Sequence, residues 1–144
     1  MKIILTTLFL TLCSLSFSQS NEKNKVLLQD QRIQKTLEEL LLKETPNAAV
    51  IFEEPSTQKF IQFAGSKTEE LLFDFPSSQL SAAEFEKATT ILKEYQIEHH
   101  AGTFSTFSKP IEKNIDLAIE LISKIMIEVL GTDEDVKLTI QTID

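Results

Sequence analysis

The sequence contains no tryptophan, one cysteine, three glycines and four prolines among its 144 residues. So little Gly and Pro excludes a collagen-like chain. Charged residues make up 25% and apolar residues 42%, which is ordinary for a globular protein and excludes wholesale disorder. This length predicts one domain, large enough to bury a hydrophobic core without disulfides or metals.

Basic residues are also scarce, because 14 Lys and Arg stand against 22 Asp and Glu, giving a formal net charge of −8. Binding to nucleic-acid phosphates or to anionic lipid depends on clustered Lys and Arg. The sequence has no stretch in which basic and aromatic residues interleave, as they do in nucleic-acid-binding chains. It therefore predicts no nucleic-acid partner.

The first eighteen residues have the three-part layout of a secretory signal peptide. Lys2 provides the positive start, residues 3–17 are mostly apolar, and the small residues Ser16 and Ser18 precede a cleavage site. The apolar stretch is shorter than the roughly 20 residues of a spanning helix. We expect residues 1–18 to be removed. Residues 19–144 then form a single domain, exported to the periplasm or the extracellular space and not stably inserted in a membrane.

The single cysteine, Cys13, lies inside this predicted signal peptide. A lipoprotein signal needs a small residue just before its Cys, and Leu12 is not small. Cleavage after Ser18 leaves no cysteine in the mature chain. Disulfides, thiol chemistry and Cys-based metal sites are therefore excluded in the mature protein.

The spacing of apolar residues predicts alternating helices and strands. A helix is expected over residues 25–44, ended by Pro46, because apolar residues recur there at helical intervals. Short apolar runs separated by turns predict strands over residues 48–53, 59–64 and 70–75. Turns this short favour an antiparallel meander.

The second half continues this pattern. Ser81 and Glu84 form a capping-box sequence, which predicts a helix that runs to about residue 96. A fourth strand is expected over residues 101–108, then a long helix that starts near Pro110 and ends at Gly131, and a closing strand over residues 136–140. The predicted fold class is α+β, an antiparallel sheet of about five strands with helices packed on one face, in the order α-β-β-β-α-β-α-β.

The third predicted helix has an unusually wide apolar surface. Its first stripe contains Ile115, Ala118, Ile119, Ile122, Met126 and Val129, and its second contains Leu117, Leu121 and Ile125. A surface helix needs only the first stripe. Either this helix is wedged between the sheet and another helix, or the second stripe is a contact surface for another subunit or a client. Under the second interpretation, Leu117, Leu121 and Ile125 are the predicted partner-binding residues.

His99 and His100 are the only two histidines. Adjacent residues do not point the same way, and the mature chain has no cysteine and no third histidine to complete a zinc site. An active site that uses one histidine with a distant carboxylate stays open as an alternative. The sequence has no Gly-x-Ser-x-Gly nucleophile motif.

Other motifs for ligands or chemistry are incomplete. A calcium loop that starts at Asp133 would need Gly at its sixth position and Glu at its twelfth, where the chain has Leu138 and Asp144. The three glycines are too scattered to form a nucleotide-binding loop. We therefore predict no catalytic residue, no metal ligand and no cofactor, and expect that the protein is not an enzyme.

Three segments together resemble a known family. They are the strand Lys-Phe-Ile-Gln-Phe-Ala at residues 59–64, the capped helix that starts at Leu80-Ser81, and the Ile115–Gly131 helix. Over residues 46–140 the chain resembles the bacterial type III secretion chaperone-like superfamily, in particular its YbjN-type and TY-Chap-type members. The resemblance implies a twisted antiparallel sheet with helices packed on it. It also implies a protein-binding, non-catalytic role, often as a dimer, with no catalytic residues to carry over. Two features depart from this family, because the chain has an export signal and ends on a strand.

These observations predict a small exported, non-catalytic protein-binding module, chaperone-like and self-associating. It would hold a polypeptide partner or a second copy through an apolar helix face or a sheet edge. One alternative is an envelope enzyme that uses the His99/His100 pair. Another is a carrier of a small apolar ligand between sheet and helices, suggested by the ten phenylalanines.

Overall fold

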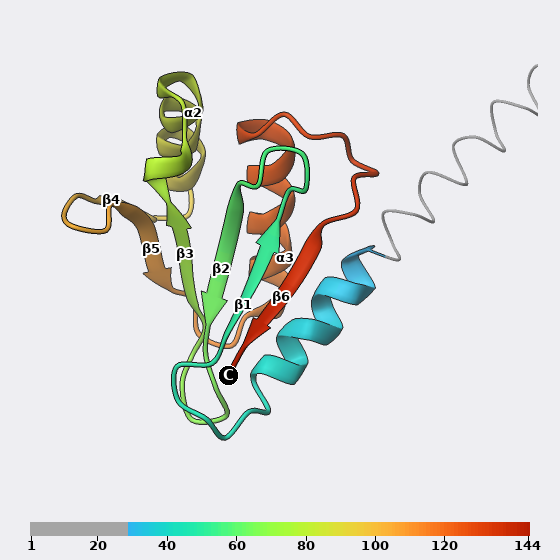
Figure 1. Ribbon diagram of the computed structural model, residues 1–144. Helices are drawn as coiled ribbons and strands as arrows, with labels where there is room; N and C mark the ends of the chain where they lie inside the picture. The colour runs from blue at the N-terminus through green and yellow to red at the C-terminus, as the bar shows by residue number, and fades with distance from the viewer. Residues whose placement is uncertain (1–28) are drawn as a thin grey trace, which may run out of the picture.

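The computed structural model describes residues 29–144 (Figure 1). The predicted signal peptide, Cys13 and the beginning of the first predicted helix lie outside the described residues. The described part is an α+β domain, as expected, with six strands where about five were expected. The strands are β1 (Ala49–Glu53), β2 (Phe60–Ala64), β3 (Leu72–Pro76), β4 (His99–His100), β5 (Thr106–Pro110) and β6 (Thr139–Ile143). The helices are an N-terminal helix over residues 29–40, α2 (Ala82–Lys93) and α3 (Ile115–Lys124).

All strands pair antiparallel in the order β4-β5-β3-β2-β1-β6. β1, β2 and β3 form the predicted meander, and β6 returns from the far end of the described chain to pair with β1. Because side chains alternate along a strand, one face of the sheet is apolar. Its buried residues include Val50, Phe52, Ile61, Phe63, Phe73, Phe75 and Phe107.

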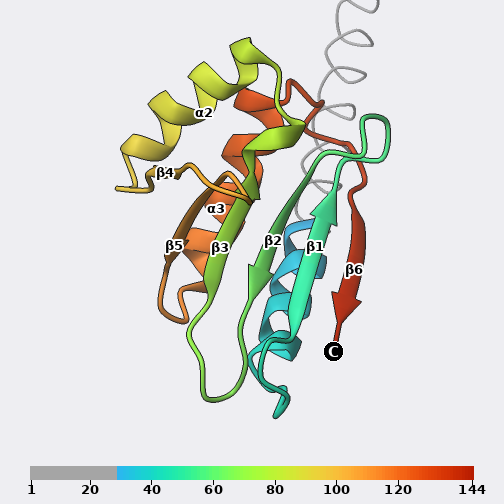
Figure 2. The same ribbon diagram turned by 60° about the vertical axis from the view of Figure 1, so that its left-hand side comes forward.

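The helices cover this apolar face. Figure 2 shows the N-terminal helix and α3 behind the sheet, on the same side of it. α2 lies at the β4 end, where the ring of Phe85 contacts the rings of His99 and Phe107 at centroid distances of 4.9 and 5.4 Å. The opposite face of the sheet has no helix among residues 29–144. The expectation of helices packed on one face is confirmed.

The capping box at the start of α2 is present as predicted. The Ser81 hydroxyl accepts a hydrogen bond from the amide of Glu84, and a Glu84 carboxylate oxygen accepts one from the amide of Ser81. Lys59, just before β2, places its Nζ 2.7 Å from the same carboxylate. Burial raises the pKa of Glu84, but the hydrogen bonds and charge of Lys59 and Ser81 outweigh it and leave the pKa below its ordinary value. The ion pair between Lys59 and Glu84 therefore links the first turn of α2 to the start of β2.

The single strand expected over residues 101–108 is wrong. The structure has a hairpin there, with the short β4 at His99–His100 and β5 starting at Thr106. The chain reverses between them, and the Ser105 hydroxyl lies 3.3 Å from the carbonyl oxygen of Gly102. The Gly-containing turn was misread as part of a strand because Thr and Phe residues surround it.

The expected helix start at Pro110 is also wrong, because Pro110 ends β5 opposite Leu72. α3 starts five residues later, after Asn114, whose side-chain oxygen accepts a hydrogen bond from the amide of Leu117 at 3.0 Å. The fixed φ of proline suits a strand end as well as a helix start, so proline alone does not decide between them. The Asn cap decides it here.

The end of this helix is as predicted. Gly131 has a φ of +68°, the left-handed conformation that terminates many helices. The last turn before it, Ile125–Val129, is π-helical, with the amide of Leu130 bonded to the carbonyl of Ile125 at 3.0 Å. The closing strand begins at Thr139 rather than at residue 136. Residues 132–138 are therefore a connection that crosses from α3 back to the sheet edge.

Candidate functional site

The second apolar stripe of α3 belongs mostly to the core. Leu121 and Ile125 are 0% exposed, and only Leu117 keeps part of its surface accessible. The residues of both stripes are members of the hydrophobic core or pack against it, so α3 uses both stripes to fill the space around it. This corrects the expectation that Leu121 and Ile125 present a contact surface, and favours the wedged-helix interpretation.

The two histidines point to opposite faces of the sheet. His99 pairs with Phe107, on the face that the helices cover, and its ring lies 5.0 Å from the Phe107 ring. Its Nε2 lies 2.9 Å from the Ser77 hydroxyl oxygen, and that hydroxyl donates to the Ser105 carbonyl at 3.0 Å. His100 pairs with Thr106 and is exposed. The pair is thus separated by the pleat, as adjacent strand residues must be.

This arrangement does not assemble a general base. Since the Ser77 proton goes to Ser105, the satisfied hydrogen-bond pattern has His99 donating from Nε2 to Ser77. No hydrogen bond joins either imidazole to a carboxylate within residues 29–144. A nucleophile and base need the opposite proton direction and a third group to orient the base. His99 connects the β4–β5 hairpin to the turn after β3.

Glu54, at the end of β1, is the most deeply buried charged residue described, at 2% exposed. Its carboxylate accepts hydrogen bonds from the amides and hydroxyls of Ser56 and Thr57, at 2.7 to 3.0 Å. Burial raises the pKa of Glu54, but these hydrogen bonds outweigh burial and bring the pKa down to about 2. The carboxylate holds the β1–β2 turn, because both of its oxygens accept hydrogen bonds from residues of that turn.

The outer edge of β6 carries backbone amide and carbonyl groups that pair with no other strand among residues 29–144. β6 pairs with β1 on one side over all five of its residues, and no strand in residues 29–144 lies on its other side. Its sequence, Thr-Ile-Gln-Thr-Ile, is rich in β-branched residues and contains no proline and no charge. A strand edge offers a row of backbone amide and carbonyl groups to any other extended chain.

Two side chains of the N-terminal helix fix the residue just before β6. The amide of Leu138 donates to Gln29 Oε1 at 3.1 Å, and the carbonyl of Leu138 accepts from the Arg32 guanidinium at 2.7 Å. The N-terminal helix therefore supplies the hydrogen-bond partners of both backbone groups of Leu138. The open edge starts at Thr139 and runs to the end of β6.

The uncovered face of the sheet carries an apolar row that reaches this edge. In register across five strands, the row contains Ile143, Ala49, Ala64, Leu72 and Pro110. Ile143 is 47% exposed and Leu72 is 41% exposed. The neighbouring row is polar at its centre, where the Asp74 carboxylate accepts hydrogen bonds from Gln62 and Thr106. An extended chain added beside Ile143 would thus meet an existing apolar row.

The sequence contained part of the signal for this edge. The alternation around Val136, Leu138 and Ile140 predicted a final strand, but the predicted start of this strand was three residues too early. Nothing in the local sequence shows which strand lies at the edge of a sheet, because that depends on pairing between distant segments.

Comparisons of the chain with family models, with curated proteins and with solved structures find no match. The resemblance to type III secretion chaperone-like proteins therefore stays a prediction. Across residues 29–144, no helix is both long and apolar enough to cross a membrane. The same described residues contain no group of three His, Cys, Asp or Glu side chains that could hold a metal ion.

Proposed function

We propose that the protein is a small exported, non-catalytic module that binds polypeptide by strand addition at the outer edge of β6. The observation that carries this proposal is the open edge over Thr139–Ile143. In this mode of recognition, main-chain hydrogen bonds supply affinity and alternate side chains supply selectivity. The added strand is a segment of a partner or β6 of a second copy.

The side chains of β6 suit such an addition. Ile140 and Thr142 face the covered side of the sheet, opposite Phe52 and Val50, while Thr139, Gln141 and Ile143 face the uncovered side. β-branched residues pair well with one another across adjacent strands. An extended segment of alternating small polar and β-branched residues would therefore match this edge, and β6 itself has that pattern.

Export and the non-catalytic role rest on separate observations. Export rests on the signal-peptide layout of residues 1–18. The non-catalytic role is supported by the hydrogen bonding of His99, which serves the hairpin. The chaperone-like part of the proposal rests on the family resemblance, and its binding surface is placed at the β6 edge rather than on α3.

The test uses the substitution Gln141→Lys, with Gln31→Lys as the matched control. Gln141 is exposed at the centre of β6, and Gln31 is exposed on the N-terminal helix. A lysine on an edge strand opposes pairing with a further strand, whereas the same change on the helix does not. Self-association is measured as the solution mass of the purified protein over a concentration series. Peptide binding is measured with a labelled peptide that copies residues 138–144.

We expect the unmodified protein to self-associate or to bind the peptide, with backbone NMR shifts concentrated in β6. Gln141→Lys should weaken the interaction by roughly tenfold, equivalent to about 1.4 kcal/mol, and Gln31→Lys should leave it unchanged. The proposal fails if neither event occurs at any concentration, or if the shifts lie away from β6.

A further inference from the structure

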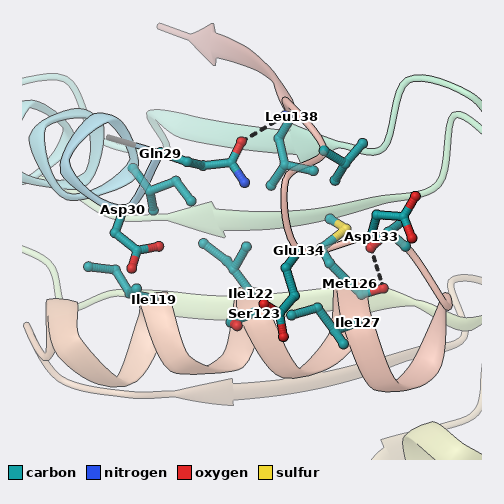
Figure 3. A pocket seen from close by; sticks show the side chains of 13 residues that line it. Gln29, Asp30, Ile119, Ile122, Ser123, Met126, Ile127, Asp133, Glu134 and Leu138 are labelled. Carbon is teal, nitrogen blue, oxygen red and sulfur yellow. Dashed lines mark hydrogen bonds between the residues drawn. The ribbon is translucent and has the colours of Figure 1, made fainter. Parts of the chain in front are cut away.

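A second surface, separate from the β6 edge, is a cleft between the N-terminal helix, α3 and the connection over residues 132–138 (Figure 3). Its volume is about 210 Å³. Drug-sized ligand sites usually measure ~300–1,000 Å³, so this cleft suits a short ligand. It lies on the helical side of the sheet and shares no residue with β6.

Part of the cleft lining is apolar. Ile33 comes from the N-terminal helix, Ile119, Ile122 and Met126 come from α3 and the π-helical turn, and Leu138 comes from the connection. The π-helical turn belongs to the wall, and its carbonyl at Met126 accepts from both the amide and the hydroxyl of Thr132. π-helical turns occur often at functional sites. An apolar ligand body would therefore contact side chains that the fold holds in place.

Among residues 29–144, the charged side chains that line the cleft are all acidic. They are Asp30, Asp133 and Glu134. In Figure 3, Asp30 points down from the N-terminal helix beside Ile119, and Glu134 points toward Ser123 from the other side of Ile122. No Lys or Arg of the described residues lines the cleft, and the neighbouring Arg32 is bonded to the carbonyl of Leu138.

The carboxylate of Asp30 is without a cation among residues 29–144. It makes no ion pair there, although it is half-buried against apolar side chains. Burial raises the pKa of Asp30, because the charged form loses contact with water. A positively charged group placed in the cleft would give this carboxylate a partner of the kind that residues 29–144 do not supply.

From this geometry we infer that the cleft binds a small amphiphile with an apolar body and a cationic amine head. The apolar body lies on Ile122 and Met126, and the ammonium group lies at Asp30 or Glu134. This ligand goes beyond the proposed strand addition, since it occupies another site. It also goes beyond a purely apolar ligand, because an acidic rim selects the sign of the head group.

The test compares three probes of equal chain length: octylammonium, octanol and octanoate. Binding to the purified protein is followed by the NMR shifts of the residues that line the cleft. We expect octylammonium to bind there roughly tenfold more tightly than octanol, and octanoate to bind most weakly. Octanoate binding as tightly as octylammonium would overturn the inference, because the head-group charge would then be irrelevant.

Two substitutions and one control locate the site. Ser123 is exposed on the rim, so Ser123→Trp should fill the cleft and abolish binding without disturbing the core. Asp30→Asn should weaken octylammonium about fivefold and leave octanol unchanged. Glu86→Gln removes an exposed carboxylate from α2, outside the cleft, and should change neither.

Binding that survives Ser123→Trp would overturn the inference. So would NMR contacts showing that residues 19–28 of the chain itself fill the cleft and are not displaced by octylammonium. Gln141→Lys should leave octylammonium binding intact. The outcome here is therefore independent of the outcome for strand addition.

Discussion

At one edge of the sheet the outermost strand, β4, has two residues, whereas at the other edge the outermost strand, β6, has five. β5, next to β4, leaves only Ser108–Pro110 uncovered. Pro110 has no amide hydrogen to donate, and Lys109 reaches across to the Tyr95 carbonyl at 3.0 Å. Short strands, lysine and proline are the means by which proteins protect sheet edges from other chains.

β6 has none of these protections. Its residues are uncharged and β-branched apart from Gln141, and its outer side has no neighbouring strand within residues 29–144. The two edges of the same sheet thus differ in how well they are protected from pairing with another strand. An unprotected edge favours aggregation, and the strand addition proposed for β6 would cover it.

The largest expected effect comes from the anchor of the protected edge. Phe107 in β5 is 1% exposed and contacts the rings of Phe75 and Phe85. Phe107→Ala should lower the free energy of unfolding by about 3–5 kcal/mol, since it removes a buried aromatic ring and leaves a cavity. Chemical denaturation measures this. A loss below about 1 kcal/mol would mean that the β4–β5 edge is not anchored as described.

Much of the fold could be predicted from such local patterns. The β1–β2–β3 meander, the capping box at Ser81 and the helix end at Gly131 depend on residues close together in sequence, and all were predicted. The β4–β5 hairpin was not predicted, because β4 has only two residues and the turn at Gly102 is followed by Thr and Phe, which are common in strands. The role of Pro110 was misread because proline suits both a strand end and a helix start.

The candidate sites were harder to predict, for a physical reason. The apolar width of α3 is visible in the sequence, but the burial of Leu121 and Ile125 depends on packing against segments that are distant in sequence. The β6 edge and the acidic cleft both arise where distant segments meet. Asp30 and Glu134 are separated by most of the chain, so no spacing rule connects them.

The second prediction concerns Glu54, at the end of β1, which is the strand that pairs with β6. The folded-state pKa of Glu54 at the end of β1 is about 2, against an ordinary value of 4.5. Its ionised form therefore adds stability that is fully present above pH 4.5 and is lost as the pH falls toward 2. This difference corresponds to about 3 kcal/mol.

Glu54→Gln should remove a stabilisation of about 3 kcal/mol at neutral pH and flatten the loss of stability between pH 4.5 and pH 2. The side-chain amide of glutamine has one oxygen that accepts hydrogen bonds and one NH2 group that donates them. It therefore cannot replace both carboxylate oxygens, which accept from Ser56 and Thr57. Denaturation at a series of pH values measures this, with Glu53→Gln on the uncovered face as the control. An unchanged acid profile in Glu54→Gln would contradict the assigned role of the carboxylate.

The smallest expected effect is at the open edge itself. Ile143 is 47% exposed at the end of β6, so Ile143→Ala should cost less than about 1 kcal/mol of folding stability. The difference between the folding free energies lost in Phe107→Ala and in Ile143→Ala measures how much more firmly the β4–β5 edge is packed than the β6 edge. If Ile143→Ala were as destabilising as Phe107→Ala, another element would have to cover β6, and the comparison between the two edges would collapse.

The position of β6 also sets an order of assembly. β1 meets β2 through a short turn, but it meets β6 only after almost the whole described chain has been made. Closing so long a loop costs entropy before any of its contacts form, so pairing between distant segments comes late in folding. Until then, β1, which contains Val50 and Phe52, is the edge strand. The sheet is complete only when β6 pairs with β1. The outer side of β6 then becomes the edge of the sheet within residues 29–144.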